Sequence, residues 1–441
     1  METVMLVCKF GGTSMADASS IAQVVNIIKA NPKRKVVVVS APGKLNGQDK
    51  ITDILIKCHK TAKEGGSCKE VFEKVKSRYL SIINDLKIDI DIAKELEDIR
   101  QEIDAGASYD YTVSRGEYLM ALIFAKHLGF AFVDAKDIIK FNADGVFEPE
   151  LTNEITKRAL ENIAEGGVVV PGFYGSKPDG SICAFSRGGS DITGAILARA
   201  LNVELYENWT DVNGFMMCDP KIVKNPKTIE SVTYKELREL SYMGAGVLHP
   251  EAIFPVRIAN ISINIKNTFE PDHPGTMIVP SKEYRRNGRI VTGIAGKKNF
   301  TVINIEKSMM NSELGFARRA LSVLEEHKIS IEHMPTGIDT FGLVIENSNI
   351  EGKLDSVIAG LKAVLNPDHI EVLQDLALIA TVGHGMSQRK GTAAKLFTAL
   401  YNADINVRMI DQGSSELNII IGVDNKDFEK SIEAIYRAFV E

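Results

Sequence analysis

Strand-like and helix-like runs alternate through the first two-thirds of this chain, and that alternation constrains the fold more than any other feature. The run Lys35–Ser40 contains four consecutive valines, which is typical of a strand buried on both faces of a parallel sheet. Helical spacing appears over Ser19–Ala30. Five further runs are rich in apolar and β-branched residues: Val4–Phe10, Ala131–Asp134, Val168–Pro171, Val203–Glu207 and Ile261–Ile265. We therefore expect an α/β fold with a mostly parallel central sheet covered by helices.

Two segments interrupt this alternation. Gly172–Cys183 is rich in turn residues, and we expect it to form an excursion, such as a hairpin, at the edge of the sheet. Residues 41–50 form a polar, glycine-bearing loop that could serve as a lid or a substrate loop.

The last third of the chain contains an internal repeat. Residues 271–288 are charged and rich in turns, and we place the main domain boundary near residue 290. Beyond it, Gly315-Phe316-Ala317 returns 76 residues later as Gly391-Thr392-Ala393, and each copy has the order strand, helix, strand, strand, helix. Two copies are too few for a solenoid. We expect a large domain over residues 1–290 and two small α/β modules, 291–370 and 371–441, packed side by side with strands that could interleave.

Composition excludes several classes of protein. The 441 residues are enough for two to three domains of about 150 residues each. A formal net charge of −6 argues against a general nucleic-acid binder. No apolar stretch approaches the roughly 18 residues of a membrane span, and no signal-peptide core follows the N-terminus. The five cysteines are scattered without a C-x-x-C pair, so we expect neither a disulfide framework nor a zinc site, and we expect a reducing cytoplasm.

The hexapeptide Lys9–Ser14, KFGGTS, lies between the first predicted strand and the first predicted helix. Glycines in such a turn let backbone N–H groups approach phosphate oxygens, and a helix N-terminus adds partial positive charge. Lys9 would add a full charge where negative charge gathers during a transfer. The hexapeptide is not a Walker A loop. Taken alone, it is also compatible with a tight turn and a solvated lysine.

A second glycine turn, FSRGGSD at Phe185–Asp191, precedes a helical pattern over Ile192–Leu201. Ser190 or Asp191 could cap that helix. Arg187 offers a planar guanidinium that matches a carboxylate in a bidentate pair. The alternative is a capped helix with a surface arginine.

Two acidic motifs complete the set. SRGE at Ser114–Glu117 starts an apolar helical run, where Glu117 could hold a substrate ammonium group or simply be a first-turn glutamate favoured by the helix dipole. TDVNG at Thr210–Gly214 follows a predicted strand, where ligands bind in open α/β sheets, although an ordinary turn explains it equally well. Together, the four motifs would place anion-binding and ammonium-binding groups around one cleft.

These segments together resemble the aspartokinase branch of the amino-acid kinase family. KFGGTS, SRGE, FSRGGSD, TDVNG with the following DPK, and IKNTFEPDHPGT occur here in that family's order. The repeated modules resemble ACT domains, which bind small amino acids. The resemblance implies an amino-acid kinase fold followed by two βαββαβ-type ACT modules. It also implies an aspartate kinase, which transfers the γ-phosphoryl group of ATP to the β-carboxylate of L-aspartate, giving 4-phospho-L-aspartate in the first step of lysine, threonine and methionine biosynthesis.

The resemblance assigns a role to each motif residue. Lys9 would neutralise the transferring phosphoryl group, and Asp191 would orient that lysine or the metal-bound nucleotide. Glu117 would hold the ammonium group of aspartate and Arg187 its α-carboxylate. The rest of the substrate pocket would comprise Ser40, Ala41, Thr52, Gly188, Gly189 and Ser190. The nucleotide site would comprise Gly11, Gly12, Thr13, Ser14, Thr210, Asp211, Met216 and Lys221. Mg²⁺ would arrive with ATP as co-substrate, without a site held by the protein alone.

The resemblance further implies feedback inhibition by lysine and/or threonine at the ACT modules, which would also join the chain into a homodimer or homotetramer. The effector site would comprise Met310, Glu313, Gly315, Phe316, Ala317, Glu332, Thr336, Ile338 and Asp339. 

Two features depart from the family pattern. Gly246 stands where many members carry a lysine. The ATP phosphates would then be bound by another cation, such as Lys221, Lys224 or Lys266, or only by the N–H of Gly246. The loop between Ser40 and Thr52 is long. The alternatives are a related kinase with another substrate and a catalytically impaired amino-acid sensor, which Gly246 alone favours.

Overall fold

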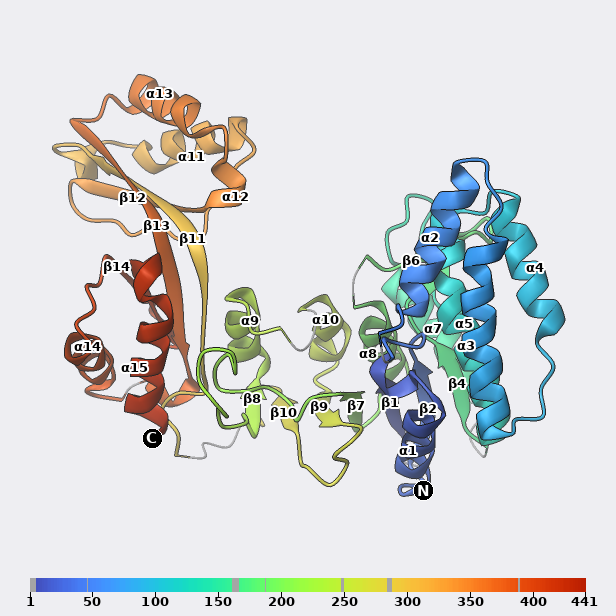
Figure 1. Cartoon of the computed structure of the whole chain (residues 1–441). Helices are drawn as coiled ribbons and strands as arrows, with labels where there is room; N and C mark the ends of the chain where they lie inside the picture. The colour runs from blue at the N-terminus through green and yellow to red at the C-terminus, as the bar shows by residue number, and fades with distance from the viewer. Residues whose placement is uncertain are drawn as a thin grey trace. The chain divides into compact units, whose positions relative to one another are not determined.

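The chain folds into two compact units (Figure 1). The structure, a computed structural model, describes residues 5–45, 47–160, 166–186, 188–246, 250–283, 288–387 and 389–441, with residues 250–252 described by their backbone alone. The first unit comprises Met1–Phe215, Thr228–Tyr234 and Gly246–Tyr284, and the second comprises Met216–Lys227, Lys235–Ala245 and Arg285–Glu441. The chain therefore passes repeatedly from one unit to the other. The domain limits at residues 290 and 370 stay predictions.

An eight-stranded sheet forms the centre of the first unit, in the order β3-β4-β2-β1-β7-β9-β10-β8. Its strands are β1 (Leu6–Phe10), β2 (Arg34–Val39), β3 (Ala131–Phe132), β4 (Val168–Pro171), β7 (Leu205–Thr210), β8 (Ser231–Thr233), β9 (Ser262–Asn267) and β10 (Thr276–Val279). Neighbours from β3 to β9 run parallel, whereas β10 is antiparallel to β9 and parallel to β8. The predicted mostly parallel sheet is confirmed, and all six predicted strands belong to it.

Helices cover both faces of this sheet. They are α1 (Ala18–Lys29), α2 (Ile51–Lys63), α3 (Lys69–Leu86), α4 (Ala93–Asp104), α5 (Tyr109–Leu128), α6 (Ala135–Ile138), α7 (Pro149–Leu160), α8 (Gly189–Ala200) and α10 (Pro250–Ile258). Cys8 and Phe10 point to one face and share a core with α1, α3 and α5. Because side chains alternate along a strand, Lys9 points to the other face, which α8 covers by packing on β1, β2 and β7.

The predicted hairpin within Gly172–Cys183 is present. Strands β5 (Tyr174–Ser176) and β6 (Ile182–Ala184) pair antiparallel and form a small sheet of their own. 

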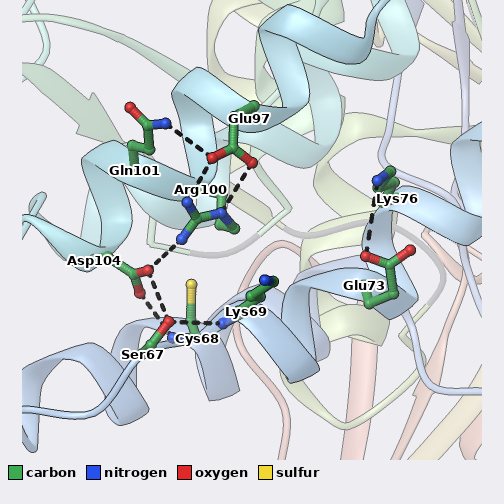
Figure 2. A network of polar contacts seen from close by, with 9 residues as sticks. All are labelled: Ser67, Cys68, Lys69, Glu73, Lys76, Glu97, Arg100, Gln101 and Asp104. Carbon is green, nitrogen blue, oxygen red and sulfur yellow. Dashed lines mark hydrogen bonds and ion pairs between the residues drawn. The ribbon is translucent and has the colours of Figure 1, made fainter.

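A polar network joins the start of α3 to the end of α4 (Figure 2). The Asp104 carboxylate accepts hydrogen bonds from the Cys68 backbone N–H at 2.7 Å and from the Ser67 hydroxyl at 2.9 Å. Arg100 donates to the same carboxylate at 2.5 Å and to both oxygens of Glu97. Hydrogen bonds from Arg100 hold the pKa of Glu97 at about 2. Cys68 provides no capping side chain, so Asp104 caps α3 from α4 by binding the Cys68 N–H and the Ser67 hydroxyl, and the same Ser67 oxygen accepts from Lys69 N–H at 3.3 Å.

We expect Asp104→Ala to lower the free energy of unfolding by about 1–2 kcal/mol, the usual cost of losing a helix N-cap. Urea denaturation followed by circular dichroism would measure it. Asp98→Ala, an exposed change on the same helix, is the matched control and should stay within about 0.5 kcal/mol of the parent chain. Equal losses from the two variants would contradict the capping role.

The second unit is built on a five-stranded antiparallel sheet, in the order β12-β11-β13-β15-β14. Its strands are β11 (Gly293–Glu306), β12 (Thr340–Glu346), β13 (His369–Val382), β14 (Met409–Asp411) and β15 (Asn418–Asp424). Its helices are α9 (Tyr234–Tyr242), α11 (Phe316–Glu326), α12 (Asn347–Ile350), α13 (Leu354–Leu365), α14 (Thr392–Asn402) and α15 (Phe428–Val440). The antiparallel sheet and the amphipathic helices follow from the repeated apolar pattern of this region.

The two repeat copies share this one continuous sheet. Gly293 at the start of β11 pairs with Val382 at the end of β13, whereas Glu306 at the end of β11 pairs with His369 at the start of β13. Each of these strands has 14 residues, and their pairing joins the first copy to the second. In the first copy the expected middle strand is reduced to the isolated bridges His333–Val344 and Thr336–Phe341.

All five cysteines are free and buried. Across the described ranges, no helix is long and apolar enough to cross a membrane. In the same parts of the chain, no three His, Cys, Asp or Glu side chains are grouped to hold a metal ion.

Candidate functional site

The carboxyl ends of four parallel strands meet at one edge of the first sheet. Gly11 N–H donates to the Trp209 carbonyl at 3.0 Å, which joins the glycine turn after β1 to the end of β7. Ser40 N–H donates to the Phe10 carbonyl at 3.1 Å, and Gly172 N–H donates to the Val39 carbonyl at 3.0 Å. The turn after β1, the loop after β2, the start of the hairpin and the loop after β7 therefore lie together, at the edge where open α/β sheets bind ligands.

Lys9 and Asp191 form a shielded ion pair at this edge. The Lys9 Nζ atom lies 2.6 Å from Asp191 Oδ1, and the two side chains are only 9% and 16% exposed. Asp191 is in the first turn of α8, which begins at Gly189 and has Gly188, with φ of 60°, as its N-cap residue. The predicted capping by Ser190 or Asp191 is therefore wrong. Because Asp191 lies inside the helix, its carboxylate is directed to Lys9 instead of to the helix N–H groups.

The glycine turn is tied to the loop after β7. Thr13 Oγ1 donates to Asp211 Oδ2 at 3.0 Å, and Thr210 Oγ1 donates to the other oxygen of Asp211 at 3.2 Å. Ser14 is fully buried, and its hydroxyl shares a 2.7 Å hydrogen bond with Thr268. These contacts bring together the predicted nucleotide residues Thr13, Thr210 and Asp211.

Helix α1 (Ala18–Lys29) confirms the helix predicted over Ser19–Ala30, but a short 3₁₀ helix separates it from the glycine turn. Thr13–Met15 forms a short 3₁₀ helix, and α1 begins only at Ala18. Asp17 caps α1 by accepting a hydrogen bond from Ser20 N–H at 2.8 Å. The positive end of α1 is thus occupied by a carboxylate of the chain itself, and the charge available to an anion at the turn comes from Lys9 and from backbone N–H groups.

The loop after β2 packs directly on the glycine turn. Gly43 N–H donates to the Gly12 carbonyl at 2.8 Å, and a Cβ atom on Gly12 would lie 3.0 Å from the Ala41 carbonyl oxygen. Arg78 of α3 holds both segments, because its Nη1 donates to the carbonyls of Ala16 and Gly43, each at 3.3 Å. Sequence reasoning missed Arg78, since nothing local to α3 marks one arginine among its many charged residues.

Glu117 is a buried carboxylate with one oxygen unsatisfied. It lies in the middle of the 20-residue helix α5, so the alternative of a first-turn glutamate is wrong. It is 6% exposed, and among the described residues its Oε2 atom has no hydrogen-bond partner. Burial raises the pKa of Glu117 to about 7. Backbone hydrogen bonds from Ala41 and Glu117 and the positive charge of Arg115 act in the opposite direction and lower this pKa. A positively charged ligand group would satisfy this oxygen.

The neighbours of Glu117 place it beside the loop after β2. A Cβ atom on Gly116 would lie 2.7 Å from the Ala41 Cβ atom, so α5 approaches the loop closely only because residue 116 is glycine. On the hairpin side of this sheet edge, Ser190 packs closely on Gly172, because a Cβ atom there would lie 2.5 Å from the Ser190 hydroxyl.

Several predicted residues are not among those that the contacts above bring together. Arg187 lies outside the described residues. Thr52 is half-buried in the first turn of α2, and no hydrogen bond within the described chain links it to the other predicted residues. Met216 and Lys221 belong to the second unit. Lys266 lies over the ring of Trp209 at 5.1 Å, on the sheet face opposite Lys9, which argues against it as a substitute cation for the lysine missing at Gly246.

The second unit holds a separate cavity of about 290 Å³ at the start of α11. Six of the nine predicted effector residues line it, namely Met310, Glu313, Gly315, Phe316, Ala317 and Thr336, together with Arg318 and Phe341. Glu313 is already paired with Lys307 at 2.5 Å and with Arg319.

The three remaining effector residues do not line this cavity. Glu332 accepts a hydrogen bond from the Tyr242 hydroxyl of α9. Ile338 is 72% exposed, and the Asp339 carbonyl accepts a hydrogen bond from Lys307 N–H at 2.9 Å.

Comparison with known proteins gives consistent matches over the whole chain. Residues 4–267 match the amino acid kinase family, and residues 379–439 match an ACT domain. Aspartokinase 3 of Bacillus subtilis is 39% identical over 453 residues, which cover 99% of this chain and 98% of that protein. The crystal structure of Clostridium acetobutylicum aspartate kinase is 51% identical with a TM-score of 0.92, covering 99% of this chain and 100% of the other.

Two structures of Escherichia coli aspartokinase III are also similar, each over 99% of this chain and all of the other. One, in complex with aspartate and ADP, is 26% identical with a TM-score of 0.75. The other, in complex with lysine and aspartate, is 27% identical with a TM-score of 0.74.

Proposed function

The chain belongs to the amino acid kinase family and, within it, to the aspartokinases, and from that premise we propose how its site transfers a phosphoryl group from ATP to L-aspartate. One observation carries the proposal. A buried lysine lies at the same sheet edge as Glu117, a buried carboxylate with an unsatisfied oxygen. A cation for an anionic phosphoryl group and an anion for an ammonium group are the two charges that this reaction requires.

The reaction needs charge neutralisation more than it needs a base. The β-carboxylate of aspartate has a reference pKa of about 3.9 and is already ionised at neutral pH, so it can attack phosphorus directly. The main obstacle is the repulsion between this anion and the nucleotide phosphates. Lys9 would offset the charge on the transferring phosphoryl group, and Asp191, 2.6 Å from Lys9 Nζ, would orient that ammonium group.

The acceptor would be held by groups of opposite sign. The unsatisfied Glu117 oxygen would accept from the ammonium group of aspartate, and Arg187 would bind its α-carboxylate. The remaining pocket residues would be Ser40, Ala41, Thr52, Gly188, Gly189 and Ser190. Binding at both ends of the amino acid would fix the direction in which its β-carboxylate points.

The nucleotide would lie over the glycine turn and the loop after β7. Backbone N–H groups of Gly12, Thr13 and Ser14 would contact its phosphates. The Gly11 N–H already donates to the Trp209 carbonyl, so Gly11 would contribute only the close approach that a residue without a side chain allows. Thr210, Asp211, Met216 and Lys221 are the other residues that we propose for the site. Mg²⁺ would enter with ATP, bound mostly by phosphate and water oxygens, and would neutralise part of the phosphate charge.

A substrate panel tests this function directly. The purified protein would be incubated with ATP, Mg²⁺ and hydroxylamine, which traps an acyl phosphate as a coloured hydroxamate. Aspartate should give product, whereas glutamate and N-acetylglutamate should give little. Product from glutamate alone would indicate a related kinase, and no product from any acid would favour the amino-acid sensor.

We further propose that the second unit is regulatory and that it joins chains into a homodimer or homotetramer. The support is the cavity at Phe316, which six of the nine predicted effector residues line. A lysine ligand would need an acid for its ε-ammonium group, and Glu313 is the carboxylate in the cavity lining. Since Glu313 is paired with Lys307 and Arg319, the ligand ammonium would have to replace one of these cations. In the cell the product would feed lysine, threonine and methionine synthesis in the cytoplasm.

Titration with lysine and threonine, separately and together, should lower aspartate kinase activity. An effector with a coupling free energy in the usual range changes aspartate affinity about 5- to 150-fold. Glu313→Gln should weaken the response to lysine while leaving uninhibited activity unchanged. A flat activity curve with both amino acids would contradict feedback control by these ligands.

A further inference from the structure

Asn208 is an asparagine at an unfavourable position. It lies in β7, a parallel strand near the middle of the sheet, and is only 3% exposed. Asparagine is depleted in strands, and burying its amide costs free energy unless both polar ends find partners. Asn208 is not one of the predicted substrate or nucleotide residues. The partners of its side chain indicate why an asparagine is present at this position.

Both ends of the Asn208 amide face the Lys9–Asp191 pair. Asn208 and Lys9 are register partners in the parallel strands β7 and β1, so their side chains leave the sheet on the same face. Asn208 Nδ2 donates to Asp191 Oδ1 at 2.9 Å, the same oxygen that lies 2.6 Å from Lys9 Nζ. Lys9 Nζ in turn lies 3.5 Å from Asn208 Oδ1. The reverse orientation of the amide would set its oxygen against the carboxylate, so these two partners determine the orientation.

Tyr206 holds the same part of α8 from the next position on this face of β7. Its hydroxyl donates to the Asp191 backbone carbonyl at 3.1 Å. The close packing of α8 on β7 depends on Gly194, because a Cβ atom there would lie 2.5 Å from the Tyr206 hydroxyl. Tyr206 therefore restrains the backbone of Asp191, and Asn208 restrains its carboxylate.

We propose that Asn208 is a positioning residue for phosphoryl transfer, which acts by fixing the carboxylate of Asp191 and through it the ammonium group of Lys9. This inference rests on the proposed function, because it concerns how the transfer is supported. With Asn208 in place, one Asp191 oxygen receives two donors and the carboxylate has a single orientation. Without it, the carboxylate can rotate and draw Lys9 away from the position where charge develops. Preorganised charge of this kind acts in the transition state, so its loss lowers kcat more than it raises KM.

The test uses two substitutions at Asn208 and one matched control in the full-length protein. Asn208→Leu removes both polar ends at similar volume. Asn208→Asp keeps the shape but replaces the NH₂ donor by a carboxyl oxygen beside Asp191. Asn264→Leu makes the same change on the neighbouring strand β9, where the Asn264 Oδ1 atom is buried without a partner in the described chain. Steady-state kinetics for aspartate and ATP would be measured from pH 6 to pH 9, with thermal unfolding as a check on folding.

Asn208→Leu should lower kcat about 10- to 100-fold, the usual effect of losing a hydrogen bond to a charged group, with KM for aspartate and ATP within about threefold of the parent values. The ratio of its kcat to that of the parent should not change with pH. Asn264→Leu should leave kcat within about twofold.

Asn208→Asp should show a distinctive pH dependence. Two carboxylates in contact share one proton, so the pKa of the pair is raised and the protonated form can donate to Asp191. The ratio of kcat for this variant to kcat for the parent should therefore rise as the pH falls, whereas the ratio for Asn208→Leu should not change with pH.

Two results would overturn the inference: kcat within twofold of the parent for a folded Asn208→Leu variant, or the same flat pH ratio for both Asn208 variants. If Asn208→Leu does not fold, the pH ratio of Asn208→Asp decides alone. A parent protein that does not phosphorylate aspartate would instead reject the proposed function, so the two failures are distinguishable.

Discussion

Replacing Lys9 by alanine is expected to lower kcat for aspartate phosphorylation by about a hundredfold to a thousandfold, because it removes a preorganised positive charge from the transferring phosphoryl group. Lys9 is 7% exposed, and its ammonium group is held by Asp191 at 2.6 Å, so its charge is in place before the substrates bind. Steady-state kinetics with saturating aspartate and ATP would measure the loss.

Two further variants make the Lys9 result interpretable. Lys9→Met keeps the apolar stem of the side chain packed and should show the same loss of kcat, which separates the charge from the packing. Lys29→Ala removes an exposed lysine at the end of α1 and should leave kcat unchanged. Emission from Trp209, the only tryptophan of the chain, whose carbonyl accepts the Gly11 hydrogen bond, would report whether nucleotide still binds. Normal turnover by folded Lys9→Ala would remove Lys9 from the mechanism.

Glu117→Gln is expected to weaken aspartate binding and, at the same time, to stabilise the unliganded protein. The variant lacks the negative charge that would bind the substrate ammonium group, and the loss of one partner from a buried charge pair corresponds to about a 30- to 1000-fold increase in KM for aspartate. The stabilisation arises because burial raises the pKa of Glu117 from 4.5 to about 7. Above pH 7 the folded parent therefore contains a buried ionised carboxylate, which lowers its free energy of unfolding.

The stabilisation by Glu117→Gln should depend on pH in a defined direction. A carboxyl group whose pKa is raised on folding contributes its stability below the unfolded pKa of 4.5 and loses it as the pH rises through about 7. The variant should therefore match the parent near pH 4 and exceed it at pH 8 by up to about 3 kcal/mol. Urea denaturation without ligands at both values would measure this difference, with Glu64→Gln as the exposed control.

The same pKa predicts how the parent enzyme responds to pH. Glu117 must be ionised to bind an ammonium group, so kcat/KM for aspartate should rise between pH 6 and pH 8 and level off above it. In Glu117→Gln this rise should disappear. A pH profile of kcat/KM that is identical in the two proteins would show that Glu117 does not bind the substrate ammonium group. Equal stability of the two proteins at pH 8 would show that Glu117 carries no buried charge.

Local patterns were sufficient to predict six of the eight strands of the first sheet and the edge at which the candidate site lies, but not β8 and β10. Runs such as Lys35–Ser40 are apolar because both faces of their strands are covered, and parallel strands bring their carboxyl ends to one edge. That rule was enough to gather the four motifs around one cleft, whereas the relation of Lys9 to Asp191 and the shared role of Thr13 and Asp211 were implied by the resemblance to aspartokinases. Nearly two hundred residues separate the two members of each pair.

Two of the features that sequence reasoning missed depend on long-range packing. Asn208 and Arg78 look ordinary in their own segments, and only the register of β7 with β1 and the approach of α3 to the loop after β2 reveal what they contact. Ser190 and Asp191 have good capping side chains, but the left-handed conformation at Gly188 starts the helix earlier. The four residues of the SRGE motif do not show where α5 begins. The helix starts before this motif, and Glu117 therefore lies in its interior.

The continuous sheet of the second unit has a consequence for protein engineering. Because β11 of the first copy and β13 of the second pair with each other from end to end, a gene cut at residue 370 would leave each fragment with only part of the hydrogen-bonded ladder and with exposed strand edges. The repeat copies should therefore melt in a single cooperative transition. A chimaera that borrows the sensing properties of a relative would have to exchange the entire segment from β11 to α15 in one piece.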